Sequence, residues 1–100
     1  MTDKILVQYV GFQSAGLVRE YTFLVREISC EPREFTLTIA NEAFVSHRAR
    51  YQDAPDICSL RLQRELAAHA NRPPATDFII TNTEIEDYRS AHAPKSARNA

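Results

Sequence analysis

The chain has 100 residues, of which 44% are hydrophobic and 25% are charged, and its formal net charge is −1. This composition is typical of one small globular domain and excludes two separate cores. Only two glycines are present, which argues against the glycine-rich loops that cradle phosphates. Gly11 and Gly16 have P-loop spacing, but Leu17 and Val18 stand where that loop needs Lys and Ser or Thr.

Nothing in the sequence directs the chain to a membrane or an export pathway, so we expect a soluble, cytoplasmic protein. The apolar run of residues 5–7 ends at Gln8, and no small-residue cleavage site follows it. No stretch approaches the roughly 18 apolar residues that a bilayer span needs. Cys30 and Cys58 lie far apart and form no C-x-x-C pair, so we expect two free thiols rather than a zinc site or a disulfide.

The N-terminal part predicts a hairpin. Residues 4–12 are apolar on both alternations, as in an interior strand, and we place this strand away from the sheet edge. A turn signal at residues 13–16 leads into a second strand, residues 17–29. Its inward face carries Tyr21, Phe23 and Val25. Leu24 interrupts the polar face of this strand, which indicates either a bulge or a second covered surface.

Residues 34–39 have the cleanest strand alternation in the chain. Phe35, Leu37 and Ile39 face inward and alternate with threonines. After this strand, residues 43–45 either continue it beyond a bend or belong to the loop that leads to Tyr51. The sequence does not decide between these two structures.

An amphipathic helix is predicted from Asp53 to about Ala70. Pro55 fits its first turn, and acidic residues there favour the positive end of the helix dipole. The apolar arc of this helix consists of Cys58, Leu60, Leu62, Leu66, Ala67 and Ala70. The opposite side carries Arg61 and Arg64, so the helix is expected to cover a sheet with one face.

The C-terminal part predicts a fourth strand, residues 77–81, and a short helix in which residues 83–86 form a capping box. Residues 94–100 contain no apolar anchor and are expected to form a disordered tail beyond a single domain, residues 1–93. The order βββαβα defines an α+β fold. We expect a single antiparallel sheet of three to four strands, with one main amphipathic helix packed on one face.

The best candidate binding segment precedes the main helix. It concentrates an imidazole, two guanidinium groups, a phenol and a carboxylate, carried by His47, Arg48, Arg50, Tyr51 and Asp53. Such a segment suits anion or phosphate recognition beside a helix N-terminus. The simpler interpretation is a solvated connection whose arginines pair with local carboxylates.

The histidines and cysteines form no site that the spacing supports. His47, His69 and His92 lie in a loop, at a helix end and near the tail, without an H-x-x-x-H or H-E-x-x-H pattern. Cys58 belongs to the apolar arc and is interpreted as a small core residue. We therefore expect no metal and no cofactor.

The sequence does not identify a ligand, a partner or a pathway. The leading interpretation is a small non-catalytic binding or protein-interaction module, with a sheet face or edge available to a partner or to a second copy in a homo-oligomer. One alternative is a nucleic-acid-binding domain that uses the arginine-rich loop, Arg61 and Arg64, with Tyr51 as a stacking ring. The near-neutral net charge argues against it. The other alternative is a small enzyme that uses His47 and Asp53.

Overall fold

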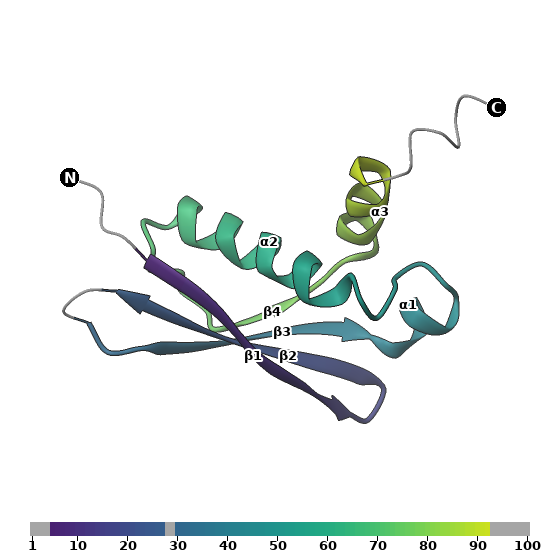
Figure 1. Cartoon of the computed structure of the whole chain (residues 1–100), viewed down its shortest axis with the longest axis horizontal. Helices are drawn as coiled ribbons and strands as arrows, with labels where there is room; N and C mark the ends of the chain where they lie inside the picture. Colours follow the sequence, from purple (N-terminus) through teal and green to yellow (C-terminus); the bar gives the residue numbers. More distant parts are fainter. Residues whose placement is uncertain (1–4, 28–29, 93–100) are drawn as a thin grey trace.

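The computed structural model describes residues 5–27 and 30–92 and has an α+β fold in the order that the sequence predicts (Figure 1). The sheet contains β1 (Ile5–Ala15), β2 (Val18–Glu27), β3 (Arg33–Ala40) and β4 (Asp77–Ile79), in that spatial order. The helices are α1 (Asn41–Val45), α2 (Ala54–Ala68) and α3 (Asn82–Ala91). The expected tail at residues 94–100 lies outside the described residues.

The sheet is antiparallel except at one pair of strands. β1, β2 and β3 pair antiparallel in sequence, whereas β4 pairs parallel with β3, with Phe78 beside Leu37. The expectation of a fully antiparallel sheet is therefore wrong for this last pair. Its cause is the connection: α2 carries the chain back along the sheet, so the next strand enters in the same direction as β3.

β1 lies at the sheet edge, and its expected place in the interior is wrong. The apolar character on both of its alternations comes partly from a bulge. Pairing with β2 shifts between Tyr9 and Gly11, which leaves Val10 as the extra residue. The shift places Phe12 opposite Tyr21, so Phe12 faces the core side of the sheet like Tyr9. The bulge proposed to explain Leu24 in β2 thus occurs in the neighbouring strand.

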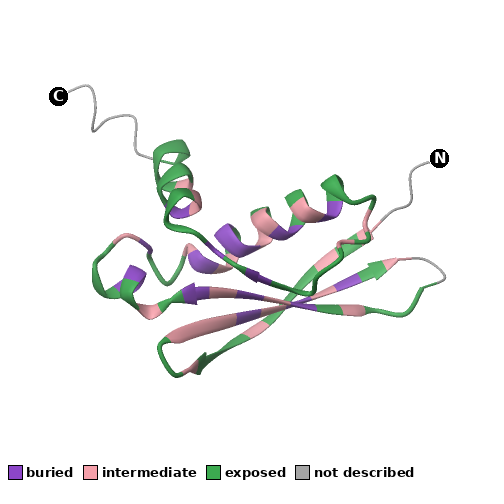
Figure 2. Ribbon diagram, turned by 180° about the vertical axis from the view of Figure 1, so that it is seen from behind, coloured by how far each residue is buried: buried purple, intermediate pink, exposed green. Residues whose placement is uncertain are grey.

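The core lies between one face of the sheet and α2, as Figures 1 and 2 show. The inward faces expected for β2 and β3 are confirmed, since Phe23 and Leu37 are 2% and 0% exposed. The buried residues of α2 are Ala54, Ile57, Cys58, Leu62 and Leu66. Ala67, Ala70 and Leu60 of the expected arc are exposed. The predicted apolar arc is too wide, because a straight helix packed on a sheet buries only a narrow stripe of its own surface.

α1 and α3 complete the described structure on the helical side. Residues 43–45 form neither strand nor loop but most of α1, whose Phe44 is buried. α3 opens with a capping box, but its N-cap is Thr81, and its third helical residue is Glu84. The expected box at residues 83–86 was therefore two residues late. Ile85 then turns into the core and is 1% exposed.

Candidate functional site

The residues of the predicted binding segment do not converge on one site. Arg48 forms an ion pair with Glu42 of α1, as the solvated interpretation expects. Tyr51 leaves the segment in another direction and stacks on Phe44, with 4.4 Å between the ring centroids. Arg50 remains exposed. The segment thus contributes to two separate surfaces.

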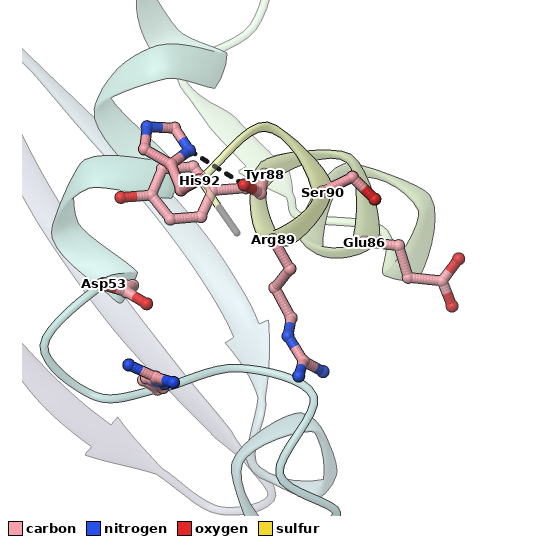
Figure 3. A pocket seen from close by; sticks show the side chains of 7 residues that line it. Asp53, Glu86, Tyr88, Arg89, Ser90 and His92 are labelled. Carbon is pink, nitrogen blue, oxygen red and sulfur yellow. Dashed lines mark hydrogen bonds between the residues drawn. The ribbon is translucent and has the colours of Figure 1, made fainter. Parts of the chain in front are cut away.

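The first surface is an open pocket of about 550 Å³ between the segment and α3 (Figure 3). Its lining consists of Arg50, Asp53, Glu86, Tyr88, Arg89, Ser90 and His92. The Tyr88 ring stacks on His92, and its hydroxyl donates to Asp56 at 2.7 Å, which raises the pKa of Tyr88 to about 12. Arg89 reaches across and donates to the His47 carbonyl oxygen at 3.3 Å.

The charges of this pocket do not select a ligand. Arg50 and Arg89 favour an anion, but the carboxylates of Asp53 and Glu86 line the same space and oppose one. The Arg89 guanidinium is also engaged by the segment's backbone. The contacts present are those of a packed junction between α3 and the segment.

The arginines of α2 bind carboxylates within the protein. Arg61 donates a hydrogen bond to Glu84 of α3. It also donates to Glu65, which lies one turn further along α2, at 2.9 Å. Arg64 donates to the other carboxylate oxygen of Glu84 at 2.9 Å. Glu84 also caps α3 by accepting from the Thr81 backbone N–H. This Glu84 network, as we call it, joins α2 to α3 and engages Arg61 and Arg64, two of the four arginines that the nucleic-acid interpretation uses.

The described residues form neither a catalytic pair at His47 and Asp53 nor a cluster of metal ligands. No hydrogen bond or ion pair joins His47 to Asp53 in the described ranges. Within residues 5–27 and 30–92, no three His, Cys, Asp or Glu side chains gather closely enough to hold a metal ion. Cys58 is 0% exposed, and burial raises the pKa of its thiol to about 12, which keeps it protonated and weakly nucleophilic. Its interpretation as a core residue is confirmed.

The second surface follows β1, where the cover of α2 ends. Exposure on the core face of the sheet rises from 0% at Leu37 in β3 and 2% at Phe23 in β2 to 39% at Tyr9 and 52% at Phe12 in β1. A groove of about 450 Å³ separates the start of β1 from α2. Its lining consists of Ile5, Val7, Gln63, Leu66, Ala67 and Asn71. In Figure 2 the hairpin of β1 and β2 is correspondingly pink and green over most of its length.

The exposed edge of β1 is unusual in its composition. Its eleven residues, ILVQYVGFQSA, include no charged residue and no proline. The opposite edge, β4, is only three residues long. Sequence reasoning missed this surface because the same apolar composition led to an interior placement. The absence of charged residues in β1 was the available signal, but it indicates an unprotected edge only once β1 is known to be an edge strand.

Near the hairpin end of β1, four residues form what we call the Arg19 cluster: Arg19, Phe12, Phe44 and Tyr51. The Arg19 guanidinium lies 4.1 Å from the Phe12 ring centroid and 4.4 Å from that of Tyr51. Phe44 is 5.7 Å away. All three rings therefore lie within cation–π range of the guanidinium. The sequence did not indicate Arg19 as a site residue, since its neighbours come from β1, α1 and the loop before α2.

Comparisons of the chain with known protein families, curated proteins and solved structures gave no match. Among the described helices, none has the length and apolar character required to cross a bilayer.

Proposed function

We propose that this protein is a protein-interaction module that pairs with a second copy of itself through the free edge of β1. The observation that carries this proposal is the uncharged, proline-free edge of eleven residues. Monomeric proteins protect such edges with charges, proline, short length or bulges. β1 has only the bulge at Val10, whereas β4 is protected by its short length.

A second copy fits this edge better than a charged partner does. A two-fold axis beside β1 would set two copies of the strand antiparallel and join the two sheets. Because β1 carries no charge, the paired strands would bring no like charges together. The contact would also cover Tyr9 and Val10, two apolar side chains that are exposed along β1.

The dimensions of the edge suit a stable dimer. Eleven extended residues at about 3.4 Å each give a contact roughly 37 Å long. A standard interface of roughly 800 Å² per partner then requires a strip roughly 20 Å wide. Such a strip would contain the strand edge, the exposed side chains of Leu6, Tyr9 and Val10, and the groove beside Ile5 and Val7.

The proposal is tested by the oligomeric state of the full chain. Size-exclusion chromatography with light scattering, over a concentration series, should give the mass of a dimer that dissociates on dilution. Val10→Lys places a charge in the middle of the edge and should weaken dimerisation by at least about tenfold, which corresponds to about 1.4 kcal/mol. A monomer at every concentration would overturn the proposal.

Ile79→Lys is the matched control. Ile79 is a β-branched residue at the opposite edge and is 71% exposed, compared with 56% for Val10. This variant should dimerise like the wild type. Equal loss of dimer in both variants would contradict pairing at β1 and would place the contact elsewhere. Hydrogen exchange adds a backbone readout, since amides of β1 should exchange more slowly in the dimer.

The proposal assigns the protein no catalytic role and no nucleic-acid partner, in line with the occupied side chains of Arg61 and Arg64. We also infer a cytoplasmic location, where a reducing environment keeps Cys30 and Cys58 as the free thiols seen in the structure.

A further inference from the structure

Arg19 differs from the other half-buried arginines of the described chain. Arg33, Arg48 and Arg61 are likewise of intermediate exposure, and each forms an ion pair with a glutamate. Arg19 forms no ion pair with any residue in the ranges 5–27 and 30–92. A guanidinium withdrawn from water without a carboxylate is costly, because its charge is only partly compensated.

The groups around Arg19 supply aromatic surface but no negative charge. Phe12 and Tyr51 lie over its guanidinium at 4.1 and 4.4 Å. Beside it lies the buried Tyr21 hydroxyl, which interacts with the Arg19 side chain. Burial raises the pKa of Tyr21, while hydrogen bonding to the Arg19 side chain and the Arg19 charge partly oppose this rise, so the phenol stays neutral at physiological pH. The part of the chain that the structure describes therefore provides no counterion for Arg19.

This arrangement leaves one part of the guanidinium free for a ligand. Phe12 and Tyr51 lie close to the guanidinium carbon, and no carboxylate among residues 5–27 and 30–92 pairs with its N–H donors. Two parallel N–H groups match the two oxygens of a carboxylate. The rims of the rings remain accessible, since Phe12 is 52% exposed and Tyr51 is 58% exposed, and they offer apolar contact to the group that carries the anion.

We propose that the Arg19 cluster is a binding site for a carboxylate attached to an apolar group, with Arg19 as the bidentate donor and Phe12 and Tyr51 as its apolar walls. Contacts with the neighbouring rings hold the guanidinium in place before the ligand arrives, which reduces the entropy lost on binding. This site goes beyond the proposed dimer. It uses side chains on the core side of the sheet, whereas strand pairing uses the backbone edge of β1.

The test is a titration of the isotope-labelled full chain with N-acetyl-leucine, followed by amide chemical shifts. Saturable shifts are expected at Phe12, Arg19 and Tyr51. N-acetyl-leucinamide, which has the same apolar body without the charge, should give no saturable shifts. Inorganic phosphate should bind at least about tenfold more weakly than N-acetyl-leucine, since it lacks the apolar group. Equal binding of the acid and its amide, or of the acid and phosphate, would overturn the proposal.

Variants separate this site from general electrostatic attraction. Arg19→Gln should weaken N-acetyl-leucine binding at least about tenfold, and Arg19→Lys should not restore it, because an ammonium lacks the planar fork. Arg26→Gln removes an exposed arginine on the opposite face of the same strand and should bind like the wild type. Equal affinity in Arg19→Gln and Arg26→Gln would refute the site.

Two further variants keep the test independent of folding and dimerisation. Tyr51→Ala removes one exposed wall while Arg19 remains, and it should weaken binding without loss of a dispersed amide spectrum. Leu6→Lys alters the β1 edge at a position far from Phe12 and 59% exposed, and it should leave N-acetyl-leucine binding intact. Saturable N-acetyl-leucine binding to a monomeric wild type would support the site and contradict only the proposed dimer. Undiminished binding in Tyr51→Ala would contradict the stacked geometry.

Discussion

The Glu84 network offers the sharpest test of how α3 is held. Replacement of Glu84 by alanine removes both the capping interaction with Thr81 and the ion pairs with Arg61 and Arg64. Glu84 and Arg61 have side chains only 14% and 18% exposed, so this pair is screened less than a surface pair. The Arg64 side chain is 64% exposed and contributes correspondingly less.

The expected cost follows from these contacts. Loss of the capping interaction costs about 1 kcal/mol. Loss of the partly buried pair costs about 1 kcal/mol, and loss of the exposed pair costs about 0.5 kcal/mol. Glu84→Ala should therefore lower the free energy of unfolding by about 2–3 kcal/mol, or the Tm by roughly 10–15 °C in a domain of this size.

Urea denaturation followed by circular dichroism measures this loss. Glu86→Ala, at an exposed position in the same helix, should change the free energy of unfolding by no more than about 0.5 kcal/mol. Glu84→Gln retains a capping amide but loses the charge. Its free energy of unfolding should therefore lie between those of Glu84→Ala and Glu86→Ala, and it should approach that of the wild type at high salt. Equal midpoints for Glu84→Ala and Glu86→Ala would refute the network as a source of stability.

Three other predictions concern the core, the buried thiol and the loop. Leu66→Ala should lower the free energy of unfolding by about 2–5 kcal/mol in a denaturation experiment. Leu60→Ala, at a position 43% exposed, should lower it much less. Similar losses in the two variants would mean that the wrong face of α2 was assigned to the core. Burial raises the pKa of Cys58 from 9.0 to about 12, so between these pH values the unfolded state binds fewer protons and the free energy of unfolding falls as the pH rises. Cys58→Ala should flatten this decline. Fluorescence anisotropy should detect no salt-sensitive RNA or DNA binding at physiological ionic strength, and a micromolar complex that is lost on Arg50→Ala would contradict this expectation.

The sequence alone determined the elements that depend on local pattern. The alternation of apolar residues with threonines around Leu37 predicted β3 and its inward face. Pro55, with acidic residues beside it, predicted the start of α2, and the apolar spacing of Leu62 and Leu66 predicted its buried side. These features repeat every two residues or about every 3.6 residues, so a short window of sequence contains them.

Only the tertiary structure decided the features that join distant parts of the chain. The edge position of β1 depends on which strands find neighbours, and the parallel pairing of β4 depends on the path of the chain through α2. The Arg19 cluster requires a bulge at Val10 to turn Phe12 toward the core side, and a loop that places Tyr51 over the same guanidinium. No local pattern encodes such contacts, because their energies come from residues that meet only after the sheet and the helices have packed.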